Sequence, residues 1–323
     1  MYKYTVKRVL LMIPTLIGAA ILVFALLRLI PGDVCMLRLA GDGAFVDQAA
    51  IEQCRIQTGI ADPFFVQFGR FLVGMFTFDF GTSMWTGQPV THEIALRFKL
   101  SLEIAILATL VSIVISIPLG TISAIKQNTW IDYVVRSFSI AGIAIPSFWL
   151  GILIILGLLI TTQAWFGIAW MPPINYVSPF EDPLGNIAQL IWPALATGYR
   201  YSAVATRMTR SAMLEVLGED YIRTARAKGL PARLVLRRHA LRNALIPVLT
   251  ILGLQFAFLL AGTIIIENVF YLPGLGRLVF QAITQRDLIV VESVVLLLVA
   301  TVVIVNFLVD LAYAWADPRL RRR

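Results

Sequence analysis

Charge, histidine and cysteine are all scarce in this sequence. Only 14% of its 323 residues are charged and 59% are apolar, whereas a soluble globular domain typically carries about 25% charged residues. The mean hydropathy is +0.82. This composition excludes an ordinary soluble domain and predicts an all-α protein that crosses a membrane several times, because helices satisfy their own backbone hydrogen bonds in lipid.

The sequence also lacks the motifs that nucleotide binding, catalysis or metal binding would need. The chain has no GxxxxGK[ST] loop to hold nucleotide phosphates and no arrangement of nucleophile and base. Its two histidines, His92 and His239, are predicted to lie on opposite faces of the membrane, which argues against a metal site. We therefore expect no catalytic residue, metal or cofactor on this chain, and no enzymatic activity of its own.

Six stretches are long enough to cross a hydrocarbon core of about 30 Å at about 1.5 Å per helical residue. They are roughly 9–30, 100–123, 137–162, 187–208, 243–266 and 289–312. The first is too long for the apolar part of a cleaved signal, so we expect a retained anchor. The chain then divides into residues 1–30 with the N-terminal tail and first span, a small outer segment at 31–99, and a five-helix core at 100–323.

Basic residues predict the orientation. Of the 27 Lys and Arg residues, 18 fall on the face that holds both termini, seven fall on the other face, and Arg28 and Arg200 lie within spans. Because cytoplasmic segments are enriched in Lys and Arg, the two termini are predicted to be cytoplasmic. The positions of these residues, beside apolar runs, are typical of orientation signals and not of a nucleic-acid site.

The outer segment contains both cysteines, Cys35 and Cys54. An oxidising compartment would permit a disulfide between them, and two buried free thiols are an equally good interpretation. Residues 63–78 are apolar but short for a span, so we expect them to lie on the membrane surface or against other helices.

Two ionisable residues lie deep in predicted spans, Arg200 and Glu292. A charge at the centre of a membrane helix costs about 2.5–3.5 kcal/mol on insertion scales and is usually paired or turned toward a water-filled path. We predict that both residues face a translocation path, with a purely structural pairing as the alternative.

The most polar stretch of the chain is residues 215–242, EVLGEDYIRTARAKGLPARLVLRRHALR. Its apolar spacing predicts a helix from Asp220 to Lys228, which Gly229 ends and after which Pro231 starts a second helix. The positive charge alone fits any cytoplasmic loop. The helix-Gly-helix pattern is more specific and indicates a surface that a partner grips.

Several motifs of this chain resemble those of the dipeptide, oligopeptide and nickel permease family of bacterial ABC importers. In the polar stretch they are TRS at 209–211, MLEVL at 213–217, EDYIRTARAKG at 219–229 and HALRNA at 239–244. Others are PGD at 31–33, DFGTS at 79–83, PGLGR at 273–277 and DPR at 317–319. Together these motifs extend over nearly the whole chain.

The resemblance implies a six-helix permease of the type I importer class in a bacterial inner membrane. It implies that residues 209–242 form a cytoplasmic coupling loop that docks on an ATPase subunit. The ATPase-coupling residues would be Glu219, Asp220, Tyr221, Arg223, Thr224, Ala225, Arg226, Ala227, Lys228 and Gly229. The implied partners are a second, homologous permease, two ABC ATPases that use ATP and Mg, and a periplasmic substrate-binding protein.

The general importer motif reads EAA, three residues, Gly, nine residues, then I-x-L-P, and this chain keeps part of it. Counting back from Gly229, Arg223, Thr224 and Ala225 occupy the EAA positions, and His239 and Arg242 occupy those of Ile and Pro. These departures look typical of the peptide branch. They leave docking intact but remove the Glu to which a role could be assigned.

Substrate and mechanism class have alternatives. Permeases that resemble this chain serve di- and oligopeptides, which we expect here, and also nickel complexes, glutathione and some oligosaccharides. A secondary transporter that needs no ATPase would show inverted repeats or broken helices, and we find no clear repeat in the sequence.

Overall fold

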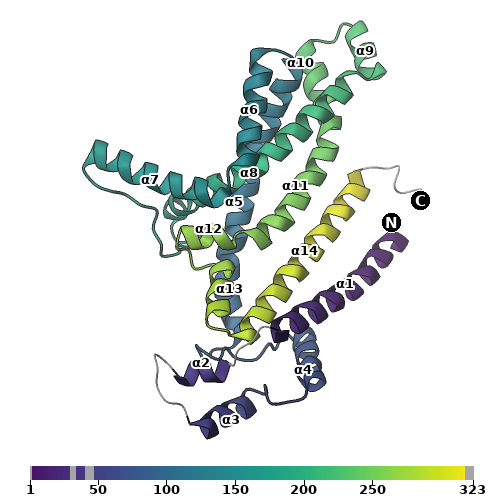
Figure 1. The fold of residues 1–323 in the computed structure, drawn as a ribbon. Helices are drawn as coiled ribbons and strands as arrows, with labels where there is room; N and C mark the ends of the chain where they lie inside the picture. The colour runs from purple at the N-terminus through teal and green to yellow at the C-terminus, as the bar shows by residue number, and fades with distance from the viewer. Residues whose placement is uncertain (1, 30–33, 41–46, 317–323) are drawn as a thin grey trace. The chain divides into compact units, whose positions relative to one another are not determined.

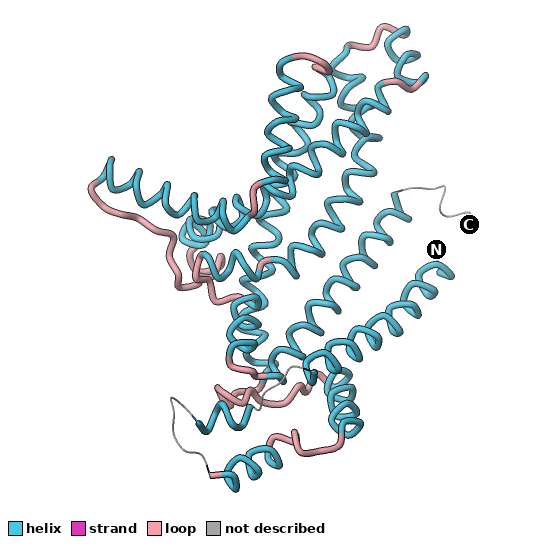
Figure 2. The backbone as a smooth tube through the Cα atoms, viewed as in Figure 1, coloured by secondary structure: helices cyan, strands magenta, loops and turns pink. Residues whose placement is uncertain are grey.

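The computed structural model describes residues 2–29, 34–40 and 47–316, and within these ranges the chain is helical. Among the described residues, β-pairing is limited to one isolated bridge between Thr82 and Pro89, and Figure 2 draws this part of the chain as helices joined by loops. The PGD and DPR motifs at 31–33 and 317–319 lie outside the described residues.

The helices, which are labelled in Figure 1, form two compact units. The first unit comprises residues 102–272 with 304–316, and the second comprises 2–101 with 273–303. The second unit contains α1 (Tyr2–Leu29), α2 (Val34–Ala40), α3 (Gln48–Gln57), α4 (Phe64–Thr77) and α13 (Leu275–Thr284). The first contains α6 (Trp130–Ala144), α7 (Ser147–Phe166), α8 (Pro183–Leu217), α9 (Asp220–Ala227), α10 (Ala232–Leu234), the π-helix η1 (Val235–Leu241), α11 (Arg242–Gly262) and α12 (Ile264–Val269). Two helices, α5 (Val90–Ile125) and α14 (Leu288–Ala316), have residues in both units.

Five helical stretches of the described chain are long and apolar enough to cross a membrane. They are Arg8–Leu29, Val90–Ile125, Ser147–Phe166, Ala232–Leu260 and Leu288–Leu311. The remaining predicted span, 187–208, lies within α8, which is long enough but less apolar than the other five. It therefore stays a prediction.

The predicted span at 137–162 is wrong as a single helix. α6 ends at Ala144, and α7 begins at Ser147 after Pro146 and runs off in another direction (Figure 1). Proline lacks an amide hydrogen and disfavours helical backbone in the residue before it, and Ile145 is accordingly extended. The apolar stretch that can cross the membrane is therefore α7.

In the first unit, α8 is the central helix and packs against α6, α7 and α11. Small residues permit its close approach to α5. A side chain on Gly198 would come within 2.6 Å of the Ala108 carbonyl oxygen, and one on Gly120 within 2.5 Å of Thr209. Larger residues at these positions would separate the two helices.

In the second unit, α4 packs against α1. Phe24 of α1 contacts the rings of Phe64, Phe68 and Phe71, with centroids 5.2, 5.2 and 5.6 Å away. α4 is shorter than a span, so the prediction that residues 63–78 lie against other helices is confirmed.

Also in the second unit, buried Asp287 holds the loop before α5. Its Oδ2 accepts hydrogen bonds from the Ser83 hydroxyl at 2.6 Å and from the Met84 amide at 3.1 Å.

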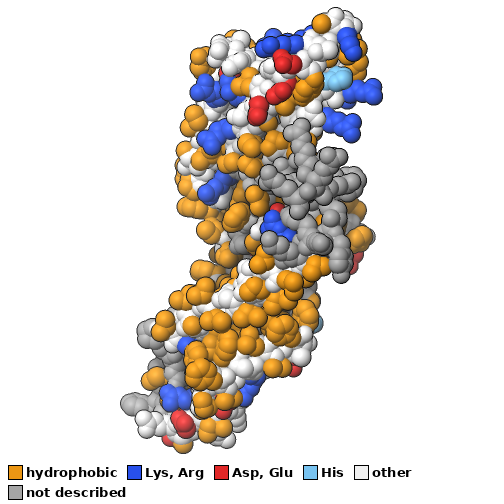
Figure 3. Space-filling model, turned by 90° about the vertical axis from the view of Figure 1, so that its right-hand side faces the viewer, with side chains coloured by type: hydrophobic (Ala, Val, Ile, Leu, Met, Phe, Trp, Pro, Cys, Tyr) orange, Lys and Arg blue, Asp and Glu red, His pale blue; other side chains and the backbone are white. Residues whose placement is uncertain are grey.

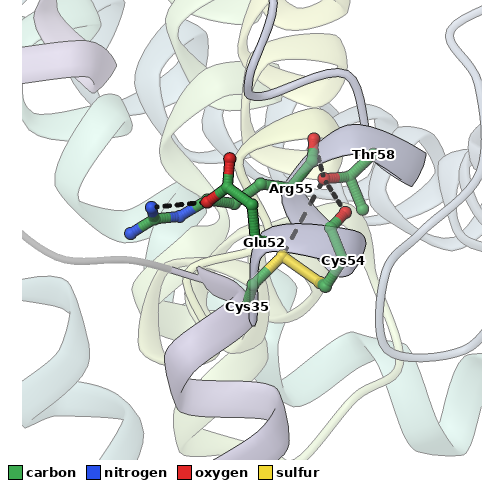
Figure 4. Close-up of a disulfide and its surroundings, with 5 residues drawn as sticks. All are labelled: Cys35, Glu52, Cys54, Arg55 and Thr58. Carbon is green, nitrogen blue, oxygen red and sulfur yellow. Dashed lines mark hydrogen bonds and ion pairs between the residues drawn. A yellow bond between two sulfur atoms is a disulfide. The ribbon is translucent and has the colours of Figure 1, made fainter. Parts of the chain in front are cut away.

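The structure joins Cys35 of α2 to Cys54 of α3 by a disulfide, with Cα atoms 5.8 Å apart (Figure 4). Beside it, the Thr58 hydroxyl donates a hydrogen bond to the Cys54 carbonyl at 2.8 Å. We propose that this bond forms in the native protein and links the two short helices α2 and α3.

The proposed disulfide is testable by intact mass. Alkylation without reductant should add no label, and alkylation after reduction should add two, because both sulfurs are engaged in one bond. Double substitution of Cys35 and Cys54 by Ser should also lower the stability of the α2–α3 region by about 3 kcal/mol, as a loop of this size predicts. Label on the untreated protein would show free thiols and refute the bond.

Candidate functional site

The candidate site is the turn from α8 to α11, which contains the short helix α9. Glu219 precedes this helix in an extended conformation, and Asp220 places a negative charge in its first turn, which favours the helix start. The helix runs from Asp220 to Ala227, so the predicted helix is confirmed to within one residue.

Gly229 ends α9 with a φ of +75°, which disfavours any residue that carries a side chain. The Gly229 amide donates to the Arg226 carbonyl at 2.9 Å, and the Leu230 amide donates to the Ala225 carbonyl at 3.4 Å. This pair of bonds is a Schellman motif, which satisfies carbonyls that the helix end would leave free. The predicted role of Gly229 as a helix stop is confirmed.

One face of α9 is buried. Ile222 is fully buried and Ala225 is 7% exposed. They belong to an apolar cluster, hereafter the elbow cluster, with buried residues from five helical elements: Ala124, Ala205, Ala212, Met213, Ile222, Ala225, Val235, Ala240, Ala244, Val248 and Leu252. The elbow cluster thus attaches α9 to α8, η1 and α11.

A side-chain hydrogen bond adds to this attachment. The Asn243 amide at the start of α11 donates to the Tyr221 hydroxyl at 2.8 Å. The short helix α9 is therefore held both by the apolar packing of Ile222 and Ala225 and by the hydrogen bond between Asn243 and Tyr221.

The other predicted coupling residues are exposed. These are Glu219, Asp220, Tyr221, Arg223, Thr224, Arg226, Ala227, Lys228 and Gly229. Ala225 is the exception, because it packs inward. Basic side chains are prominent at this end of the first unit in Figure 3. The exposed face carries charged side chains of both signs beside the small side chain of Ala227.

Sequence reasoning missed the π-helix η1, residues 235–241. It connects α10 to α11 and carries Arg237, Arg238 and His239. The i→i+5 turns of a π-helix are rare and often occur at functional sites. Apolar periodicity does not distinguish this geometry from an α-helix, so the sequence held no signal for it.

A second missed feature is a buried ion pair between α6 and α8. The Arg210 guanidinium donates to both carboxylate oxygens of Asp132, each at 2.8 Å. Asp132 is fully buried and also accepts from the Ser123 hydroxyl and from the Asn128 amide. The pair ties the α5–α6 turn to α8 seven residues before that helix ends.

The bonds from Arg210 hold the pKa of Asp132 well below its usual range, and they raise the pKa of Arg210. A carboxyl with a lowered folded pKa contributes its full stability above the unfolded value of about 3.9 and loses it as pH falls through the folded value. The pair therefore stays intact over the whole neutral range.

The two predicted path residues lie in different units. Arg200 is exposed on α8. Glu292 of α14 is 4% exposed and forms an ion pair with Arg28 of α1. The Arg28 guanidinium also lies 3.8 Å from the centre of the Phe24 ring. Arg28 and Glu292 both line a cavity of about 670 Å³ in the second unit. That Glu292 faces a translocation path stays a prediction.

Comparison with known proteins places these features in context. The family described as "Binding-protein-dependent transport system inner membrane component" matches residues 116–322, and its N-terminal counterpart matches residues 1–105. The first match covers α9 and the two long helices on either side of it, α8 and α11.

Individual proteins are similar over nearly the full length. The chain is 42% identical to a Brucella abortus protein named as a peptide transport system permease, with 98% of each chain covered. It is 36% identical to a dipeptide transport system permease of Alkalihalophilus pseudofirmus, covering 99% and 100%. It is 39% identical to a glutathione transport system permease of Pectobacterium atrosepticum, covering 99% of each.

Among solved structures, a chain of the inward-facing MetNI methionine ABC transporter has a similar fold. The TM-score is 0.51 at 18% identity, over 69% of this chain and 96% of that chain. At this identity the likeness concerns the fold alone.

The Asp132–Arg210 pair predicts a specific loss of stability. Asp132→Asn should lower the free energy of unfolding by about 3 kcal/mol, because the partly buried Arg210 loses the fully buried carboxylate that pairs with it. Asp62→Asn is the matched control, since Asp62 pairs with Arg70 in an exposed site, where such pairs contribute about 0–1 kcal/mol. Thermal unfolding of both variants in detergent measures the difference, and equal effects would contradict a structural role for the buried pair.

Proposed function

The chain belongs to the binding-protein-dependent transport system inner membrane component family, and we propose that it conducts di- or oligopeptides when a partner ATPase moves its α9. It is a membrane permease subunit of an ABC importer. The observation that carries the proposal is the placement of α9, a capped helix with one face on the elbow cluster and the other exposed.

The mechanical argument starts from the elbow cluster. Protein interiors are close-packed and transmit displacement. A partner that moved α9 would move Ile222 and Ala225, and with them the parts of α8 and α11 in contact with these residues. α8 is in turn fixed to the start of α6 by the Asp132–Arg210 pair. A push on one short helix would thus reach three long ones.

In this proposal, ATP is hydrolysed by other subunits. Two ABC ATPases would bind ATP and Mg, close, and shift the exposed residues of α9. A second, homologous permease would complete the path, and a periplasmic binding protein would deliver cargo. The host membrane would be the inner membrane of a bacterium, with both termini of this chain cytoplasmic, as the distribution of Lys and Arg supports.

The proposed cargo rests on the similar proteins. Those compared above carry names that refer to peptides, dipeptides and glutathione, which is itself a small peptide. Nickel complexes and oligosaccharides remain the alternatives from the motif resemblance, and no observation in this structure favours them.

The coupling proposal predicts the effect of bulk on α9. Ala227→Trp should reduce ATP-dependent uptake at least about tenfold and weaken recovery of the ATPase with the tagged permease, because a large side chain on a face that must seat in a cleft prevents contact. Ala227 is exposed, so the substitution should leave folding unchanged.

Ala232→Trp provides the matched control. Ala232 is also exposed but lies beyond the Gly229 break, at the start of α10. It should keep most uptake and most bound ATPase. If Ala227→Trp transports normally, or if the two variants lose activity equally, α9 is not the specific contact.

A further inference from the structure

α8 differs from the five apolar helices of this chain. Its 35 residues are long enough to cross a membrane, yet it is not among the stretches apolar enough to do so in lipid. Much of its surface is buried, including Gly198, Ser202, Thr206 and Thr209. The close approach to α5 at Gly198 and Thr209 shows what covers that side.

The opposite side of α8 carries a polar stripe. Arg200, Arg207, Ser211 and Glu215 are all exposed. Their spacings of seven, four and four residues place them on one face of an α-helix. This face, hereafter the α8 stripe, ends next to the turn that leads into α9.

Arg200 is the deepest charge of the α8 stripe. It lies midway along α8, between Pro183 and Leu217, so each end of the helix is about 26 Å away at the rise of an α-helix. Arg200 also falls within the predicted span 187–208, where a lipid-facing charge would be costly. No residue that the structure describes forms an ion pair with Arg200 or Arg207. The two arginines therefore need water or an anionic group from outside the described part of the chain.

We propose that the α8 stripe lines the translocation path and that Arg200 binds the carboxylate of the cargo, with Arg207 as the next cation about 10 Å toward α9. The proposal rests on the proposed function, because a peptide with a free C-terminus supplies that carboxylate. A guanidinium matches a carboxylate with two parallel hydrogen bonds, a geometry that Lys does not reproduce.

The position of the α8 stripe links cargo to coupling. Arg200 and Arg207 lie on the same helix that contributes Ala205, Ala212 and Met213 to the elbow cluster. Motion of α9 would therefore turn or shift the arginines as well. A carboxylate held on Arg200 in one state would be presented to Arg207 and the cytoplasmic end in the next.

The test separates cargo recognition from general damage. The reconstituted importer is supplied with a peptide and its C-terminal amide, chosen by titration of the binding protein alone so that both are bound. Arg200→Gln should lower uptake of the free acid at least about tenfold, the loss expected for a charge-assisted hydrogen bond. Uptake of the amide should change less than about twofold. Arg200→Lys should retain only part of the wild-type uptake of the free acid.

Arg136→Gln is the matched control, because Arg136 is exposed on α6, outside the α8 stripe, and lies 5.8 Å from the Tyr133 ring. It should leave both cargoes unaffected. Equal loss of acid and amide in Arg200→Gln would overturn the proposal, as would loss of assembly with the second permease, which would assign Arg200 to a subunit contact. ATP-independent uptake by the wild type would instead refute the proposed function.

Discussion

The packing of Ile222 and Ala225 into the elbow cluster is the contact on which the proposed function of this chain depends. A helix of eight residues is marginal by itself, and α9 is fixed by what lies beneath it. Apolar burial makes it an extension of α8 and α11, and the Gly229 turn gives it a defined end. Without that packing, force applied to the exposed face would bend a loop and leave the membrane helices where they were.

α8 combines two requirements that conflict in most membrane helices. It packs tightly against α5, which Gly198 and, opposite Thr209, Gly120 of α5 permit. In the proposed function it must also present the exposed charge of Arg200 to the translocation path. The low apolarity of α8 agrees with that second, proposed requirement. The same property explains why a length-and-hydropathy criterion finds five spans in the described residues and leaves 187–208 out.

Local signals made α9 predictable from the sequence. Apolar residues at helical spacing and a glycine stop both act within ten residues, and the structure agrees with them. Composition likewise predicted a helical membrane protein. The Asp132–Arg210 pair was out of reach because its members are 78 residues apart and no local pattern connects them. The break at Pro146 was visible as a proline inside a span, but the new direction of α7 depends on its packing against α8 and α12.

The central claim is that a partner ATPase contacts the exposed face of α9, and site-specific photocross-linking tests it most directly. A photoreactive residue at position 226, exposed on α9, should form a covalent adduct with the ATPase subunit in the intact importer. The same residue at position 249, exposed and apolar on α11, should not. An ATPase adduct from 226 alone is the predicted result. Absence of that adduct in a complex that transports, or an equal yield from 249, would contradict the account.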